Sequence, residues 1–199
     1  MSAARFAAAF FDFDGTLVQS AQAKYQAFFE VFPATPQHRA IIEQVLAADP
    51  DGSRHVVIAE MAARMAQQGL QRAAGDPVDT YARAALAAVM ACPEMPGASQ
   101  LLENLSARMA VFIMSNTPHD ALEQLIGHRG WQRHLAGFDG YPAIKARTIA
   151  ARCSQLGISP ARAAVIGDGI SDKMAASANN CTFFHISDYT ALAGAGLKL

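Results

Sequence analysis

The fold of this chain is decided by residues 6–17, which read Phe-Ala-Ala-Ala-Phe-Phe-Asp-Phe-Asp-Gly-Thr-Leu. The apolar run from Phe6 to Phe13 predicts a β-strand of the kind that parallel sheets bury on both faces. Two carboxylates, Asp12 and Asp14, come where this strand ends, and Gly15-Thr16 suits a tight turn. Since open parallel sheets bind ligands at the carboxyl ends of their strands, the stretch predicts a strand and a candidate active site together.

Strands and helices alternate again in the C-terminal half of the chain. Apolar runs predict strands over residues 109–114, 163–166 and 181–186. Helical patterns predict helices over residues 100–107, from Thr117-Pro118 onward, over 143–156 and over 171–178. This alternation implies right-handed crossovers and an α/β fold with a parallel sheet.

The region between these two parts shows helical patterns and no strand candidate. Thr35-Pro36 has the pattern of a helix N-cap followed by proline at the first helical position, and further helices are expected over residues 56–67 and 77–91. We therefore expect a core made of residues 1–18 and 92–199, with an all-helical insert over residues 19–91.

Composition excludes several classes of protein. A chain of 199 residues with 52% hydrophobic and 17% charged residues is folded rather than disordered. A formal net charge of -1 and the absence of a Lys/Arg block argue against nucleic acid and anionic membrane as partners, so a small-molecule partner is expected. The three cysteines fit neither a disulfide framework nor a zinc site, which favours a reducing cytoplasm. No uncharged run is long enough to cross a bilayer, so we expect a soluble protein.

A second acidic motif follows the strand predicted over residues 163–166. It reads Gly-Asp-Gly-Ile-Ser-Asp over residues 167–172. Taken alone, Asp172 could merely favour a helix N-terminus. Paired with Asp12, however, Asp168 and Asp172 provide the oxygen ligands that suit Mg²⁺, which keeps several waters and binds through one or two carboxylates.

The two acidic motifs resemble the first and fourth motifs of the haloacid dehalogenase-like superfamily. In that family the first aspartate attacks phosphorus and forms an aspartyl-phosphate, while the second protonates the leaving group and then activates water. The resemblance implies that Asp12 is the nucleophile and Asp14 the acid/base, with Gly15 and Thr16 beside the substrate. It also implies a Rossmann-like three-layer core and a small helical cap inserted after the first strand.

The resemblance assigns Mg²⁺ ligands as well. They are Asp12, the backbone carbonyl of Asp14, and Asp168, with Asp172 in the outer shell. A metal is needed on physical grounds too, because a carboxylate is a weak nucleophile toward an anionic phosphate unless a cation offsets the repulsion.

Ser115-Asn116-Thr117, after the strand expected over residues 109–114, resembles the second motif of the family, and Lys145 resembles the third. Ser115 and Asn116 are expected to hold a phosphate oxygen, while Thr117 could cap the helix expected at Pro118. Lys145 is expected to offset charge on the phosphate and the nucleophile, although alanine replaces the proline that often follows this lysine in the family. It is the only lysine between Ser115 and Asp168, and Lys173 is the alternative candidate.

The predicted function is therefore Mg²⁺-dependent hydrolysis of a small phosphomonoester. The loop over residues 49–54 resembles the specificity loop of the cap, where Arg54 could bind a second anionic group of the substrate or could be a solvated loop residue. A phosphomutase, a phosphonate hydrolase and a noncatalytic module that binds a phosphorylated ligand remain as alternatives. Neither the substrate nor the oligomeric state is predicted from these residues.

Overall fold

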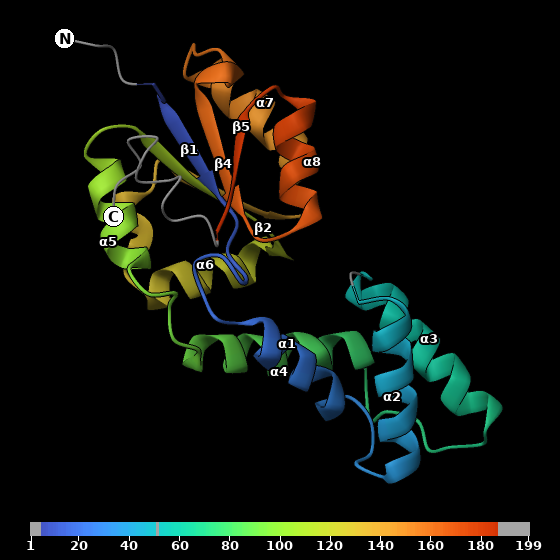
Figure 1. Ribbon diagram of the computed structural model, residues 1–199. Coiled ribbons are helices and arrows are strands. Elements are labelled where there is room, and N and C mark those ends of the chain that lie inside the picture. The colour runs from blue at the N-terminus through green and yellow to red at the C-terminus, as the bar shows by residue number, and fades with distance from the viewer. Residues whose placement is uncertain (1–4, 51, 187–199) are drawn as a thin grey trace. The chain divides into compact units, whose positions relative to one another are not determined.

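The computed structural model describes residues 5–50 and 52–186 (Figure 1). Five strands form one sheet in the order β3-β2-β1-β4-β5, and every neighbouring pair is parallel. Because β2 and β3 lie on one side of β1 and β4 and β5 on the other, the strand order reverses beside β1, and ligands bind at such switch points. The strands span Ala8–Phe11 (β1), Ala110–Pro118 (β2), Gly137–Tyr141 (β3), Ala163–Gly167 (β4) and Thr182–His185 (β5).

Helices cover both faces of this sheet, which gives the three layers predicted. Ile149 and Cys153 of α7 and Ala175 of α8 pack with Phe10 and Val165 in one buried cluster. Helices α5 and α6 lie on the opposite side of the sheet (Figure 1). The helices span Ala98–Ser106 (α5), His119–His128 (α6), Lys145–Gln155 (α7) and Ile170–Ala178 (α8), with short 3-10 helices at Trp131–His134 (η2) and Pro160–Arg162 (η3).

The chain divides into two compact units. One consists of Met1–Gln19 and Pro93–Leu199, of which residues 5–19 and 93–186 are described, and the other is Ser20–Cys92. In its described residues the second unit contains helices joined by loops and no strand. Its elements are Ala21–Ala27 (α1), Phe28–Glu30 (η1), Pro36–Ala48 (α2), Arg54–Gln67 (α3) and Pro77–Ala91 (α4).

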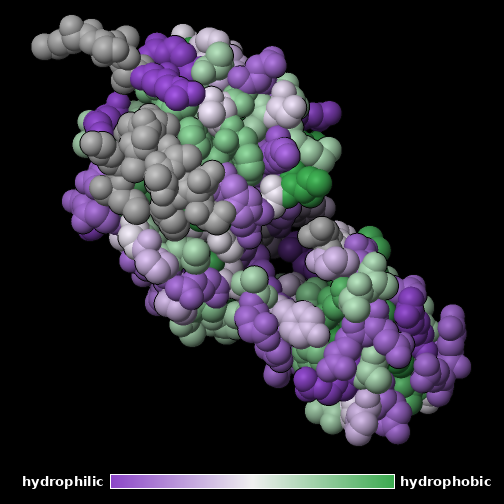
Figure 2. All heavy atoms as spheres, in the orientation of Figure 1, coloured by the Kyte–Doolittle hydropathy of each residue, from purple (hydrophilic) through white to green (hydrophobic). Residues whose placement is uncertain are grey.

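Helix caps in the second unit follow the sequence pattern. The Thr35 side chain accepts a hydrogen bond from the backbone N–H of His38, and Pro36 begins α2 as predicted. Apolar side chains of all the helical segments, among them Phe28, Ile42 and Met61, form one buried cluster. Hydrophilic residues cover much of the surface of this unit in the view of Figure 2, as an amphipathic bundle requires.

Three expectations about local structure were wrong. The edge strand β3 was not predicted, because its sequence Gly-Phe-Asp-Gly-Tyr carries residues that are rare in strands. Helix α6 begins at His119, and no side chain caps it, since β2 continues through Thr117 to Pro118. The first strand is shorter than expected, because the chain turns after it and the N–H groups of Leu17 and Val18 bond to the Phe13 carbonyl.

None of the helices among residues 5–50 and 52–186 is both long and apolar enough to cross a membrane.

Candidate active site

The carboxyl ends of three neighbouring strands carry the predicted chemistry. Asp12 directly follows β1, Ser115 lies near the end of β2, and Asp168 directly follows β4. The backbone N–H of Asp12 donates to the Ile166 carbonyl at 2.9 Å, so the β1–β4 pairing still holds the chain where the sheet ends. Strand pairing thus brings together residues that are far apart in the sequence.

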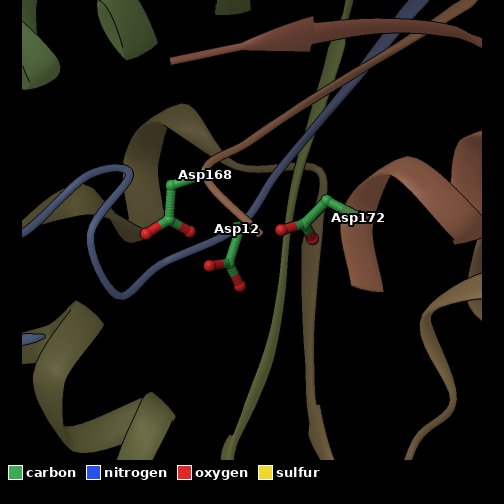
Figure 3. A group of neighbouring side chains, drawn as sticks. All are labelled: Asp12, Asp168 and Asp172. Carbon is green, nitrogen blue, oxygen red and sulfur yellow. The ribbon is translucent and has the colours of Figure 1, made fainter. Parts of the chain in front are cut away.

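Three carboxylates converge at this edge of the sheet. One oxygen each from Asp12, Asp168 and Asp172 lies within 4.8 Å of the other two. Figure 3 shows the side chains turned toward a common space from the end of β1, the loop after β4 and the first turn of α8. Asp12 and Asp172 are buried, whereas Asp168 is exposed.

This donor set fits a hard divalent cation. All three groups offer carboxylate oxygens, which Mg²⁺ prefers, and the exposed Asp168 leaves access for water ligands. Both oxygens of Asp172 already accept hydrogen bonds. Oδ1 accepts from Lys145 Nζ at 2.7 Å, and Oδ2 accepts from the Gly169 N–H at 3.3 Å. Its position therefore suits the outer shell that the resemblance implies.

Lys145 bridges two of these carboxylates. Its Nζ donates to Asp12 Oδ1 and to Asp172 Oδ1, each at 2.7 Å. The lysine is only 8% exposed and is the first residue of α7. Burial lowers its pKa, but the two carboxylates outweigh burial, and the net effect raises the pKa above 10.5. The ammonium therefore remains charged at neutral pH. Lys173, the alternative candidate, is exposed on α8.

Burial dominates the electrostatics of Asp12. Desolvation raises its pKa from 3.8 to about 7, although the Lys145 ammonium lowers it, and the carboxylates of Asp172 and Asp14 add to the rise. The two partners of this ion pair thus respond differently: Lys145 is held in its charged form, while Asp12 is pushed toward its neutral form. Burial also raises the pKa of Asp168, to which the nearby Asp172 contributes. A cation among these oxygens would favour their ionised forms.

Hydroxyl groups of β2 hold the second aspartate of the first motif. Thr117 Oγ1 donates to Asp14 Oδ2 at 2.8 Å, and Ser115 Oγ lies 3.3 Å from the same oxygen. The contact of Thr117 was missed from the sequence, which suggested only a helix cap there. The signal was present, because Ser115 and Thr117 are two residues apart, the spacing that places side chains on one face of a strand.

Gly15 and Thr16 form the turn beside Asp168. The Gly15 N–H donates to the Val18 carbonyl at 2.8 Å. Gly15 has a φ of 73°, which strains residues with a Cβ, and a Cβ here would also displace the Asp168 carboxylate, so both features favour glycine. Thr16 is fully buried, with Oγ1 3.5 Å from Asp168 Oδ1. Both residues support the acidic cluster, and their contact with substrate stays a prediction.

Asn116 and Arg54 remain candidates for substrate binding. Asn116 is exposed between the buried Ser115 and Thr117. Arg54 is the first residue of α3 in the helical unit, so the loop expected over residues 49–54 ends at Ser53, whose hydroxyl caps this helix. Residue 51 of this loop lies outside the described residues.

A histidine near the site was not predicted. His185, at the end of β5, lies with Nε2 3.1 Å from the backbone carbonyl of Asp168. His185 is exposed, and no motif in the sequence links it to the loop after β4.

The fold and site define an α/β protein with a carboxylate cluster at the switch point of a parallel sheet. A family profile described as haloacid dehalogenase-like hydrolase matches residues 6–180. The chain belongs to this family, so the predicted family is confirmed, and with it the prediction of a hydrolase. A search of curated protein sequences finds no significant match.

Solved structures of the same fold support the architecture. A predicted phosphoglycolate phosphatase from Haemophilus somnus 129PT has a TM-score of 0.67 at 19% identity, over 90% of this chain and 84% of that one. A HAD family hydrolase from Deinococcus radiodurans R1, with bound phosphate and sodium, has a TM-score of 0.66 at 22% identity, over 98% and 99%. The HAD hydrolase YfnB from Bacillus subtilis, bound to magnesium, has a TM-score of 0.68 at 15% identity, over 90% and 86%. The three-layer fold is therefore confirmed.

Proposed function

We propose that this protein is a Mg²⁺-dependent phosphatase that hydrolyses a small phosphomonoester through an aspartyl-phosphate on Asp12. One observation carries the proposal. The buried Asp12 carboxylate lies at the carboxyl end of β1, ion-paired to the buried Lys145 and within reach of the Asp168 and Asp172 oxygens. A nucleophile for an anionic substrate needs positive charge beside it, which Lys145 provides and a cation held by these carboxylates would increase.

Each nearby side chain has a role in this reaction. An Asp12 oxygen forms a bond to phosphorus while the ester P–O bond breaks, and Asp14 gives its proton to the departing alcohol. Asp14 then takes a proton from the water that attacks the aspartyl-phosphate, which releases phosphate and restores Asp12. Lys145 offsets negative charge throughout, and Ser115 and Asn116 hold a nonreacting phosphate oxygen.

Mg²⁺ would be held by Asp12, the Asp14 carbonyl and Asp168, with Asp172 in the outer shell. The ion supplies charge neutralisation and a fixed template for the phosphate. Four carboxylates beside one lysine leave an excess of negative charge in the site, which supports the binding of a divalent cation. The relatives with bound magnesium and with bound phosphate are in line with this proposal.

Residues 19–91 act in this proposal as a cap that selects the substrate, with Arg54 binding an anionic group away from phosphorus. A reducing cytoplasm remains the expected location, on the basis of the cysteine pattern.

Hydrolysis of p-nitrophenyl phosphate tests the proposal. We expect turnover with Mg²⁺ and none after chelation. Asp12→Asn should abolish turnover while the thermal unfolding curve stays cooperative, because the amide lacks the charge and the nucleophilic oxygen. Asp120→Asn, an exposed substitution of the same type on α6, is the matched control. Full activity in metal-free buffer, or phosphate release by metal-loaded Asp12→Asn, would contradict the proposal.

A screen of small phosphorylated metabolites then distinguishes a hydrolase from a mutase. Release of inorganic phosphate identifies a hydrolase, whereas an isomerised phosphate ester without phosphate release identifies a mutase.

A further inference from the structure

Hydrogen bonds connect Thr117, Ser115 and Asp14 to one another. Its hydroxyl donates to Asp14 Oδ2 at 2.8 Å, and its backbone N–H donates to Ser115 Oγ at 3.0 Å. Ser115 Oγ lies 3.3 Å from the same Asp14 oxygen. Thr117 and Ser115 are buried and Asp14 is half-buried, so both hydroxyls lie largely away from water, where hydrogen bonds fix geometry more strongly than at the surface.

The two hydroxyls cannot have the same role once substrate is bound. A serine hydroxyl has one proton, so Ser115 gives up Asp14 when it donates to a phosphate oxygen. Thr117 makes the shorter of the two bonds to Asp14 and has no assigned role at the phosphate. The Thr117 bond to Asp14 can therefore remain when Ser115 changes its partner.

The backbone of β2 is shaped to place Thr117 there. Met114 pairs with Asp139 of β3, but the next pair is Pro118 with Tyr141, so residues 115–117 lie opposite Gly140 alone. Such an irregularity re-aims side chains next to active sites. A Cβ on Gly140 would lie 2.7 Å from the Thr117 carbonyl oxygen and 2.6 Å from the His119 Cα, so the close approach requires glycine.

We propose that Thr117 is a positioning residue that orients the Asp14 carboxylate for protonation of the leaving group. The inference rests on the proposed phosphatase function, in which Asp14 is the general acid. A general acid works only within hydrogen-bond reach of the atom that it protonates, so the rate depends on the orientation of this carboxylate. Thr117 acts through Asp14 and does not itself touch the substrate.

Leaving-group dependence tests the role of Thr117. Thr117→Val keeps the shape of the side chain and removes the hydroxyl, while Thr117→Ser keeps the hydroxyl. The probes are glycerol 1-phosphate, whose alkoxide must be protonated as it leaves, and p-nitrophenyl phosphate, whose leaving group needs little protonation. The measured quantity is kcat/KM, which reports the steps through departure of the alcohol.

We expect Thr117→Val to lower kcat/KM by about 10- to 100-fold on glycerol 1-phosphate and by less than about threefold on p-nitrophenyl phosphate. Thr117→Ser should remain within about threefold of the unmodified protein on both esters. Equal losses on both esters would show a merely structural role and overturn the inference. If Thr117→Val does not fold, Thr117→Ala carries the same comparison against Thr117→Ser.

Asp14→Asn separates failure of the inference from failure of the proposed function. This variant should show a larger leaving-group dependence than Thr117→Val, and adding Thr117→Val to it should cause no further loss, because the two residues act through one proton transfer. Additive losses would overturn the inference alone. A protein that hydrolyses neither ester, or an Asp14→Asn variant without leaving-group dependence, would overturn the assigned function and the inference with it.

Discussion

Replacement of Lys145 by methionine should damage both stability and catalysis. Methionine keeps an unbranched side chain of similar length and removes the charge. The lost ammonium leaves Asp12 and Asp172, each 2.7 Å from it, as two buried carboxylates without their shared cation. Lys173→Met on α8 is the matched control, because that lysine is exposed.

The size of the effect depends on pH. Removal of one partner from a buried ion pair costs about 3 to 5 kcal/mol of unfolding free energy. Protonation of Asp12 lowers this free-energy cost, since the pKa of Asp12 is already raised from 3.8 to about 7 in the folded protein. A carboxyl group whose pKa is higher in the folded state stabilises the fold fully at pH values below its pKa in the unfolded state. This stabilisation is lost as pH rises through its pKa in the folded state. Loss of Lys145 raises this pKa further, so the difference from the unmodified protein should grow from pH 6 to pH 8.5.

Urea unfolding in chelator at both pH values measures the stability effect. We expect a loss of about 3 to 5 kcal/mol at pH 8.5, a smaller one at pH 6, and a change within about 0.5 kcal/mol for Lys173→Met. With saturating Mg²⁺, kcat/KM of Lys145→Met should fall by about 10²- to 10³-fold, as when other charge-stabilising groups are removed from active sites. An unchanged unfolding free energy at pH 8.5, or greater damage from Lys173→Met, would refute the assignment of Lys145.

Three further outcomes are expected. Gly15→Ala should destabilise the protein more than Gly157→Ala and should weaken Mg²⁺ binding, because both positions have positive φ but only a Cβ at Gly15 would meet Asp168. Equal losses of unfolding free energy in urea would contradict this. Calorimetry at pH 6 should show that Mg²⁺ binding releases protons, because Asp12, with a pKa of about 7, must ionise to bind the ion. The affinity for Mg²⁺ should therefore increase from pH 6 to pH 8, and binding without proton release would contradict this coupling. Arg54→Ala should lower kcat/KM about 10- to 100-fold on a metabolite that carries a carboxylate and hardly at all on p-nitrophenyl phosphate, and equal losses would mean that selectivity lies elsewhere.

The place of the carboxylate cluster was predictable because each of its motifs is a short run of neighbouring residues. Asp12 and Asp168 each directly follow a run of apolar residues, and parallel pairing brings the ends of such strands to one edge. Lys145 could be chosen by elimination within its segment, and the structure places its ammonium on Asp12. The fold class followed from the alternation of strands and helices, with a helical region between the first two strands.

The errors arose where local signals are weak or ambiguous. Thr117 before a proline is typical of a helix start, but the strand continues past this residue, because Pro118 pairs with Tyr141 of β3. The Thr117 hydroxyl donates to Asp14 instead. The strand β3 itself has two glycines in five residues, and it becomes a strand because β2 offers it a hydrogen-bonding edge.

The family, the layered fold and the carboxylates at the strand ends could be read from the sequence, since apolar periodicity and strand-end motifs are properties of neighbouring residues. Which of these groups meet depends on the packing of distant segments. Three features depend on distances between segments more than 25 residues apart. They are the hydrogen bonds from Lys145 to two aspartates, the rise of the Asp12 pKa to about 7, and the hydrogen bond from Thr117 to Asp14. Burial and hydrogen bonding between such segments arise from packing, for which no stretch of the sequence carries a local signal.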